Sequence, residues 1–400
     1  GSLQAVKGVL PIAIHAKKEG FKGILLPYQN ANEAAVVQDF EVYGFHHLNE
    51  VITFLKQEKD FSPISFDQQV MTAFPDDDLL DFKDVKGQEN VKRAMEVAAA
   101  GGHNMIMIGS PGSGKTMLAR RLPTILPPMT IEEALETTKI HSVAGKIQNN
   151  HSLITSRPFR SPHHTISDVA LVGGGSWPQP GEISLAHHGI LFLDELPEFR
   201  RAVLEVLRQP LEDRKITISR SKFSVEYPAN IMLIASMNPC PCGYYNHPTK
   251  ECNCPPGGVQ KYLSKISGPL LDRIDIHIEV IPVELDKITN PSDSEASSVV
   301  RTRVIAARAI QTKRFQSYPG IYCNAQMTSP LLKKYCPLDD KCVALLKIAM
   351  QRFGLSARAY DRIIKLSRTI ADLDHNEKIP PQYIAEAIQY RSLDKDGWGR

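Results

Sequence analysis

The chain has 400 residues, enough for two or three domains with buried cores. Lysine and arginine (47) barely outnumber aspartate and glutamate (44), so the net charge favours no class of partner and any basic surface must be local. No apolar run approaches the roughly 20 residues of a membrane-spanning helix, and the first residues lack the basic-then-apolar pattern of a secretory signal. We therefore expect a cytoplasmic protein without a membrane partner.

Residues 1–59 alternate short apolar runs with helical stretches, which predicts a small α/β unit. Residues 60–81 contain prolines and an acidic run and show little periodicity, which is typical of a linker between domains. The chain opens on Gly-Ser and enters patterned sequence at once, so we expect it to be part of a longer protein.

Residues 82–282 have the pattern of a second, larger α/β domain. Long helical segments there separate three strand-like apolar runs, which are 105–108, 190–193 and 231–235. This alternation predicts a parallel sheet wrapped by helices. Residues 283–297 are polar and rich in serine and proline, which indicates another linker, and residues 298–400 follow a helical pattern almost to their end.

The most specific motif is the segment Gly109–Thr116, which follows the first apolar run directly. It is a complete G-x-x-x-x-G-K-[ST] phosphate loop between a predicted strand and a predicted helix. Its glycines let backbone N–H groups surround a polyphosphate, Lys115 supplies a charge for the β- and γ-phosphates, and the Thr116 hydroxyl suits Mg²⁺. The residues expected to bind a nucleoside triphosphate are Gly109, Ser110, Pro111, Gly112, Ser113, Gly114, Lys115 and Thr116.

Two carboxylates follow the second apolar run, at the strand end where open α/β sheets bind ligands. We expect Asp194 to complete the Mg²⁺ shell and Glu195 to be the base or orienting group for the water that attacks the γ-phosphate. The third run ends at Asn238, whose amide suits a hydrogen bond to that water or to the γ-phosphate, although an asparagine before Pro239 is also a common turn residue. Beside a phosphate loop, the acidic pair predicts nucleotide hydrolysis.

The arrangement resembles an AAA+ ATPase, with Walker A at 109–116, Walker B at 190–195 and Asn238 as sensor 1. More narrowly, nearly the whole chain resembles the magnesium-chelatase-related ComM (YifB) family. Four stretches carry that resemblance: Arg157–His164, Gly173–Gly175, Pro180–Gly189 and Ser236–Gly243. The resemblance implies an AAA+ core in 82–282, a helical lid in 298–400, use of ATP and Mg²⁺, and a homo-oligomeric ring, usually a hexamer.

The same resemblance gives roles to residues outside the two Walker motifs. Arg273, in the stretch Leu270–Asp275, corresponds to the arginine finger, which enters the site of a neighbouring subunit. Arg358, in the stretch Gly354–Ala359, corresponds to sensor 2, which the helical lid brings to the γ-phosphate. The adenine pocket of such enzymes corresponds to Val85, Gly87 and Gln88.

Four of the seven cysteines form two closely spaced pairs, Cys240 with Cys242 and Cys252 with Cys254. Two thiolate pairs in a turn-rich loop can supply tetrahedral ligands to Zn²⁺. The one-residue spacers are tighter than usual and His247 lies between the pairs, so three cysteines with His247 are an alternative, as are free thiols. A zinc ion here would be structural, bracing an insertion that follows sensor 1.

Two histidine doublets, His163-His164 and His187-His188, also raise the question of a metal site. Adjacent side chains diverge on a strand or a helix, so we expect each doublet to offer at most one ligand to a given ion. That expectation favours structural or interface roles for both doublets.

The segment Arg214–Glu226 alternates apolar and polar residues on both sides of Ser219–Ser221, which predicts a β-hairpin. Its acid-free part, 214–222, carries four positive charges, for which solvated lysines that protect an edge strand are the simpler explanation. The hairpin also matches the pre-sensor-1 hairpin of this AAA+ branch, which projects into the ring pore in related helicases. Basic groups on a pore loop suit sequence-independent phosphate contact, so Arg220 and Lys222 are the expected DNA contacts.

The stretch Val6–Pro27 resembles the C-terminal part of a Lon-protease-like domain, which makes 1–59 a partial Lon-like domain. In Lon a serine and a lysine cleave peptides. Here the part aligned with the lysine motif is apolar around Leu10 and the serine-bearing half is absent from the chain. We therefore expect a role in assembly or substrate contact instead of proteolysis.

The resemblance implies an ATP-driven ring motor on single-stranded or branched DNA, namely a branch-migration helicase of natural transformation. One alternative is a magnesium-chelatase-type motor that remodels a protein partner for insertion of Mg²⁺ into a porphyrin; the cysteine-rich loop and the Lon-like segment favour the ComM interpretation. Another is a nucleotide-dependent scaffold that barely turns over, against which the intact Asp194-Glu195 pair argues.

Overall fold

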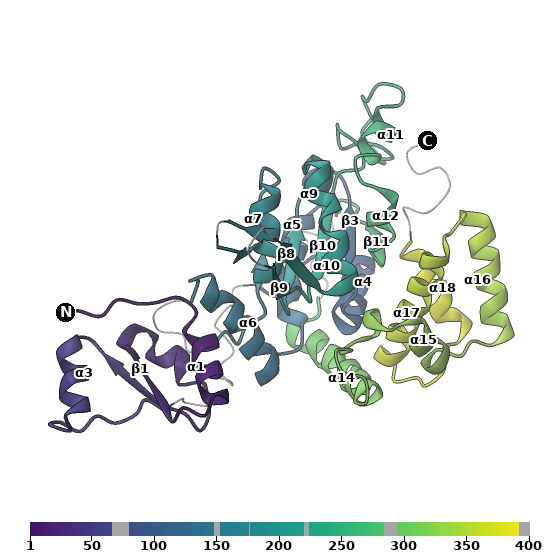
Figure 1. The fold of residues 1–400 in the computed structure, drawn as a ribbon. Coiled ribbons are helices and arrows are strands. Elements are labelled where there is room, and N and C mark those ends of the chain that lie inside the picture. The colour runs from purple at the N-terminus through teal and green to yellow at the C-terminus, as the bar shows by residue number, and fades with distance from the viewer. Residues whose placement is uncertain (66–79, 148–152, 176, 220–223, 284–293, 392–400) are drawn as a thin grey trace.

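The molecule has three parts along the chain, which Figure 1 shows as a small purple α/β unit, a blue to teal sheet domain and a yellow-green helical region. The structure is a computed structural model that describes residues 1–65, 80–147, 153–175, 177–219, 224–283 and 294–391. Arg220 and Lys222, the expected DNA contacts, lie outside the described residues. Of the helices in these ranges, none combines the length and apolar character needed to cross a membrane.

The N-terminal unit is built on two parallel strands, β1 (Gly23–Pro27) and β2 (Glu41–Phe45). Its helices are α1 (Val9–Lys18), α2 (Ala31–Ala34) and α3 (Leu48–Leu55). Helix α1 packs against α6 (Ile131–Val143) of the sheet domain, and the buried carboxylate of Glu33 accepts hydrogen bonds from Leu10 N (2.9 Å) and Ser142 Oγ at this contact. The buried charge is therefore satisfied at the seam between the two parts.

The central sheet has five parallel strands in the order β11-β3-β10-β7-β4. These strands are β3 (Met105–Ile108), β4 (Phe159–Arg160), β7 (Ile190–Leu193), β10 (Met232–Met237) and β11 (Ile276–Glu279). Alternate residues of β3 face two separate cores, since Met105 and Met107 pack in one and Ile106 and Ile108 in the other. The predicted parallel sheet is confirmed, and burial on both faces explains why β3 and β7 are apolar throughout and β10 is apolar except for Ser236.

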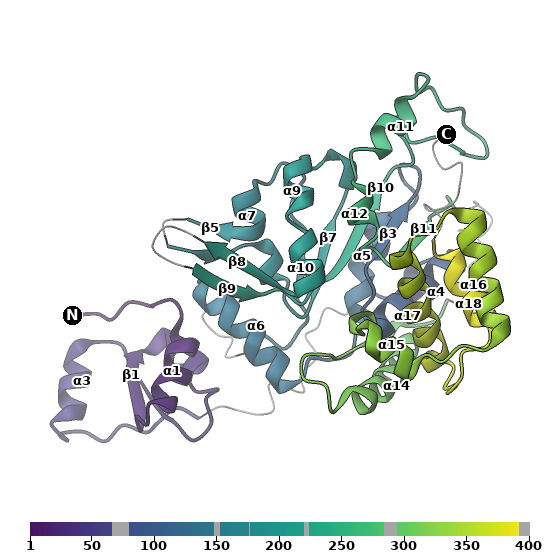
Figure 2. The ribbon, with the colours of Figure 1, turned by 45° about the vertical axis from the view of Figure 1, so that its right-hand side comes forward.

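Helices cover both faces of this sheet, as Figure 2 shows. They are α4 (Glu89–Gly101), α5 (Lys115–Arg121), α6, α7 (Asp168–Val172), α8 (Glu182–Leu185), α9 (Arg201–Glu205), α10 (Arg208–Asp213), α11 (Gly258–Leu263) and α12 (Gly268–Leu271). Two antiparallel pairs project from this domain, β5 (Gly173–Gly174) with β6 (Gln179–Pro180), and β8 (Lys215–Ser219) with β9 (Ser224–Pro228). The second pair is the hairpin that the sequence predicts.

The C-terminal region is helical, as expected. Its helices are α14 (Ser297–Phe315), α15 (Ser329–Tyr335), α16 (Asp340–Phe353), α17 (Ala357–Leu373) and α18 (Pro381–Gln389). Ser356 caps α17 by accepting a hydrogen bond from Ala359 N at 3.2 Å. Residues of α14 and α17 share one apolar core with α4 and β3, so the helical region is packed against one face of the sheet.

Candidate nucleotide-binding site and cysteine cluster

The segment Gly109–Thr116 joins the carboxyl end of β3 to α5. Gly112 (φ 77°) and Gly114 (φ 91°) have left-handed backbone conformations that favour glycine. A Cβ on Gly109 would lie 2.4 Å from the carbonyl oxygen of Val280, so the start of the loop also requires glycine. The local geometry therefore explains three of the residues that the phosphate-loop motif contains.

Lys115 lies inside this loop and is 8% exposed. Its Nζ donates hydrogen bonds to the carbonyl oxygens of Gly109 (2.7 Å) and Ser110 (2.9 Å) and lies 3.3 Å from Asn238 Oδ1. Burial lowers the pKa of Lys115, since a charged ammonium loses hydration there. The ammonium is thus held between the loop and the end of β10, where a phosphate oxygen can replace one of its neutral acceptors.

Asp194, which follows β7, contacts both the phosphate loop and the neighbouring strand β10. Its Oδ2 accepts a hydrogen bond from Thr116 Oγ1 at 2.7 Å, and its Oδ1 accepts one from Ser236 Oγ. A carboxylate and a hydroxyl at this separation are the oxygen ligands that Mg²⁺ takes beside nucleotide phosphates. Sequence reasoning missed Ser236; a buried polar residue inside an otherwise apolar strand was the available signal.

Glu195 adopts a left-handed backbone conformation (φ 54°) and its side chain is 55% exposed. One carboxylate oxygen lies 3.4 Å from Nδ1 of His164. His164 belongs to the loop after β4, and its ring packs beside that of His163 with 4.1 Å between ring centroids. The sequence favours a structural or interface role for this doublet, and the contact with Glu195 adds His164 as a candidate site residue.

The predicted adenine-pocket residues lie before α4. Val85 is fully buried, while Gln88 donates a hydrogen bond from Nε2 to the carbonyl oxygen of Ile281 at 2.5 Å. A small pocket of about 60 Å³ lies beside the phosphate loop. Its lining includes Gly109, Ser110, Gly243, His247 and Ile281. Gln88 thus contacts the segment that borders this pocket, whereas the Val85 side chain belongs to the core.

Arg273 lies near the amino ends of the parallel strands, whereas the phosphate loop follows the carboxyl end of β3. Its carbonyl oxygen accepts a hydrogen bond from Nδ2 of Asn104 (3.1 Å), the residue before β3, whereas the phosphate loop begins after β3. The four residues of β3 separate these two ends of the sheet by about 13 Å. The guanidinium of Arg273 is 4% exposed and pairs with Glu212 at 2.5 Å.

Arg358 lies near Arg273 and not at the phosphate loop of its own chain. Ser356, two residues earlier, contacts Asp272 at 3.5 Å, and the charge of Arg358 contributes to lowering the pKa of Glu212. The Arg358 side chain is exposed. The structure therefore brings Lys115, Thr116, Asp194, Glu195 and Asn238 together and leaves both arginines outside that group.

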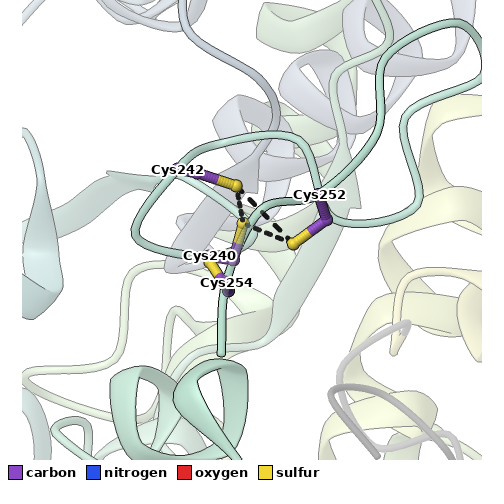
Figure 3. A group of neighbouring side chains, drawn as sticks. All are labelled: Cys240, Cys242, Cys252 and Cys254. Atoms are coloured by element: carbon purple, nitrogen blue, oxygen red, sulfur yellow. Dashed lines mark hydrogen bonds between the residues drawn. The ribbon is translucent and has the colours of Figure 1, made fainter. Parts of the chain in front are cut away.

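The four predicted zinc ligands converge in the loop after β10, as Figure 3 shows. Cys240 Sγ lies 3.3 Å from Cys242 Sγ and 3.7 Å from Cys252 Sγ, and the latter two sulfurs are 3.6 Å apart. Cys254 Sγ completes a group within 4.8 Å. A tetrahedral Zn²⁺ with bonds of about 2.3 Å would separate its sulfurs by about 3.8 Å, so the cluster fits zinc.

His247 is not part of this cluster. Its Nδ1 accepts hydrogen bonds from the backbone N–H groups of Thr249 and Lys250, both at 3.2 Å. Burial tends to raise the pKa of Cys242, but backbone N–H donors of Tyr244 and Asn253 and neighbouring thiols lower it to about 6, while the pKa values of Cys240 and Cys254 are raised. In the absence of a metal, Cys242 is therefore the thiol that most readily ionises. The geometry favours four cysteines over three cysteines with His247.

The expectation that the side chains of His187 and His188 diverge is wrong. Nε2 of His187 (3.2 Å) and Nε2 of His188 (2.8 Å) both contact Glu136 Oε2. The two histidines lie in the turn between α8 and β7, where His188 is left-handed (φ 56°), so the rule for regular strands and helices does not apply. Hydrogen bonding from His187 is the main cause that lowers the pKa of Glu136 to about 2.

In this structure the triad is a hydrogen-bonded cluster, and its ligand atoms also lie close enough together to hold a metal ion. Nδ1 of His187 accepts a hydrogen bond from the backbone N–H of Asn230 at 3.0 Å. A neutral imidazole that accepts at Nδ1 carries its proton at Nε2, so Nε2 of His187 donates to Glu136 and has no lone pair for a metal. The structural role expected for this doublet agrees with that arrangement.

Comparison with known proteins identifies the family. Family models described as "Magnesium chelatase, subunit ChlI" and "Magnesium chelatase, subunit ChlI C-terminal" match residues 81–288 and 294–391. The chain is 44% identical over 395 residues to the competence protein ComM of Haemophilus influenzae, covering 98% of this chain and 76% of the relative. It is 42% identical over 399 residues to YifB of Salmonella typhimurium, covering 99% and 76%.

A more distant relative is the magnesium-chelatase 38 kDa subunit of Cereibacter sphaeroides, which is 23% identical over 177 residues, covering 40% of this chain and 52% of the subunit. The two family models together span the sheet domain and the helical region, and the ComM and YifB matches extend over the N-terminal unit as well. The chain belongs to the magnesium-chelatase-related ComM family of AAA+ ATPases, whose members use ATP and Mg²⁺.

Proposed function

We propose that this chain is a cytoplasmic, ATP-hydrolysing ring motor that acts on single-stranded or branched DNA as a branch-migration helicase. The observation that carries the hydrolytic part is the group formed by Lys115, Thr116, Asp194 and Asn238, with Glu195 beside it, at the carboxyl end of the sheet. The Haemophilus relative is a competence protein, which supports a role in competence.

Each member of this group has a chemical task in the proposed reaction. Bound ATP would supply the phosphoryl group that is cleaved, and Mg²⁺ would neutralise negative charge on its phosphates. Lys115 would hold the phosphates, and the Thr116 hydroxyl with Asp194 would hold the ion. Glu195 accepts the proton of the attacking water at its carboxylate, and Asn238 orients that water.

The proposal includes a ring in which the subunits share each ATP site. Arg273 and Arg358 lie near the amino ends of the strands, away from the phosphate loop of their own chain, which supports contact with a phosphate in another subunit. Such an arginine is worth about 10³ to 10⁵ in the rate of phosphoryl transfer. We therefore propose that ATP is hydrolysed between subunits, in a hexamer by analogy with the family.

The β8–β9 hairpin is the proposed DNA-contacting element. Two of its four basic residues are engaged within the chain: Arg214 donates hydrogen bonds to the carbonyl oxygens of Gly320 (2.7 Å) and Gln326 (3.3 Å), and Lys215 pairs with Glu226 at 2.8 Å. Arg220 and Lys222, which lie outside the described residues, are the proposed contacts with the DNA phosphates.

The first experiment measures ATP hydrolysis by the full-length protein with and without single-stranded or forked DNA, at two salt concentrations. We expect DNA to stimulate hydrolysis less at higher salt, since phosphate contacts release counterions. Glu195→Gln should abolish turnover and retain ATP binding. A full-length ring that hydrolyses ATP without any response to DNA would exclude the helicase proposal.

The hairpin is tested by replacing Arg220 and Lys222 with alanine. DNA affinity should fall and its salt dependence should flatten while nucleotide binding stays unchanged. Lys215→Ala is the matched control, because this lysine is already paired with Glu226. Unchanged DNA affinity in the double variant would remove the proposed role of the hairpin.

We also propose that Cys240, Cys242, Cys252 and Cys254 bind one structural Zn²⁺. The ion would close the loop between β10 and α11, and the thiolates would act only as ligands. Mass spectrometry under non-denaturing conditions should find about one zinc per chain. A folded protein that contains no metal would contradict this assignment.

The N-terminal unit is proposed to be a partial Lon-like domain that serves assembly or substrate contact, and its buried contact with α6 supports a fixed attachment to the motor. A magnesium-chelatase-type motor acting on a protein partner is the second candidate, favoured by the match to the chelatase subunit. That candidate predicts ATP hydrolysis that responds to a protein partner and not to DNA.

A further inference from the structure

Arg273 is held inside the subunit, although its proposed role requires it to reach a neighbour. Its side chain is only 4% exposed. One terminal nitrogen pairs with Glu212 at 2.5 Å and the other donates a hydrogen bond to the carbonyl oxygen of Pro269 at 2.5 Å. Within the described part of the chain, the buried Nε of Arg273 has no hydrogen-bond partner.

We propose that Glu212 is a positioning residue that withdraws Arg273 from the subunit interface and competes for it with the phosphate of a neighbouring subunit's nucleotide. This inference rests on the proposed function of Arg273 as an arginine finger. A carboxylate is a suitable competitor, because carboxylates and phosphates both present anionic oxygens that can accept two parallel N–H bonds from a guanidinium.

The surroundings of Glu212 agree with a contact that can open. Its side chain is 47% exposed, so water can replace the guanidinium without leaving a buried charge. Hydrogen bonding to Arg273, followed by the charges of Arg273, Arg358 and Arg208, lowers the pKa of Glu212, which therefore stays ionised. The unpaired Nε offsets part of what the ion pair contributes, since an unsatisfied buried donor is costly.

The position of Glu212 in the chain also links this contact to the hairpin. Glu212 lies in the last turn of α10, which ends at Asp213, and β8 begins at Lys215. A displacement of the hairpin can therefore reach Glu212 through the short connection between α10 and β8, whereas Arg273 lies on the separate segment before β11. Glu212 is thus placed to relate the hairpin of a subunit to the arginine that the same subunit offers to its neighbour.

The test compares the full-length wild type with Glu212→Gln, Arg273→Ala and the double variant. ATP hydrolysis is measured against subunit concentration, with the KM for ATP and DNA affinity in parallel. Glu212→Gln should raise the rate about threefold to tenfold at subunit concentrations below saturation, because the competing charge is lost. The KM for ATP and DNA affinity should not change. In the Arg273→Ala background, Glu212→Gln should have no further effect.

Glu205→Gln is the matched control. Glu205 pairs with Arg208 at 2.9 Å in the preceding turn and is not a partner of Arg273, so its loss should leave the concentration dependence unchanged. A lower or unchanged rate for Glu212→Gln, or an equal gain in the absence of Arg273, would overturn the inference. If Arg273→Ala or Glu195→Gln hydrolyses ATP like the wild type, the proposed function itself fails.

Discussion

Replacing Asp275 by asparagine should weaken the joint between the sheet domain and the helical region. Asp275 is 1% exposed and precedes β11. Its carboxylate pairs with Arg362 of α17 at 2.9 Å and with Nδ1 of His103 at 3.2 Å, and it accepts a hydrogen bond from Asn104 N at 3.2 Å. Asparagine has nearly the same size but no charge, so the change isolates the electrostatic part of this joint.

The expected loss of unfolding free energy is about 3 to 5 kcal/mol, the range for removing one partner of a buried ion pair. Arg362 is only 19% exposed, so its charge would lose its partner in a poorly hydrated position. The matched control is Glu226→Gln, which removes an ion pair of comparable length (2.8 Å) whose two side chains are about half exposed. That control should cost less than about 1 kcal/mol.

The pH dependence gives this prediction a sign. Burial raises the pKa of Asp275, but the charges of Arg362 and Lys365 and the hydrogen bond from His103 more than offset burial and hold the pKa well below its usual range. The folded-state pKa is therefore below the unfolded value of about 3.9, so Asp275 stabilises the fold above that pH. Its contribution begins to fall below about pH 4 and is lost as the pH falls further through the folded-state pKa.

The assay is denaturant unfolding of both proteins, followed by circular dichroism, at pH 7 and at several values down to the acid transition. The difference in stability between wild type and Asp275→Asn should be largest near neutral pH and should shrink in acid. A difference below about 1 kcal/mol at pH 7, or one that grows as the pH falls, would refute the reasoning.

Three further predictions concern the nucleotide site and the cysteine loop. His164→Ala should lower kcat for ATP hydrolysis by about tenfold with little change in KM, because His164 contacts Glu195 and not the phosphate loop. Steady-state kinetics in which KM also rises would contradict this interpretation. Gly243→Ala should raise the KM for ATP about tenfold, since Gly243 has φ 84° and a Cβ there would lie 2.4 Å from Pro111 of the loop; an unchanged KM in titrations would contradict that coupling. Cys252→Ser should remove the bound zinc and lower the thermal midpoint, to be checked by metal analysis and calorimetry.

The sequence predicted the parts of the site that are contiguous in the chain. The phosphate loop and the Asp194-Glu195 pair are local patterns, and the order of strand, turn and helix around them follows from periodicity. The contacts of Asp194 with Ser236 and of Glu195 with His164 depend on which strands are neighbours in the sheet. That order is a tertiary property, so no spacing in the sequence reveals it.

The histidine doublets show a second limit of sequence reasoning. The rule that adjacent side chains diverge assumes a regular strand or helix, and the left-handed backbone of His188 falls outside that assumption. The strands β4, with two residues, and β11, which contains His277 and Glu279, carry too little apolar pattern to be recognised. The burial of Arg273 beside Glu212 likewise cannot be predicted from the sequence, because a motif indicates the role of a side chain but not how exposed it is.

The joint at Asp275 also bears on how the two arginines of a subunit move. Arg273 lies two residues before Asp275 on the same turn of chain, and Arg358 lies four residues before Arg362 on the same face of α17. The ion pair between Asp275 and Arg362 therefore connects the segment that carries Arg273 to the helix that carries Arg358. In the ring that we propose, this tie would carry both arginines toward the neighbouring phosphate together, and the contact with Glu212 would act on Arg273 alone.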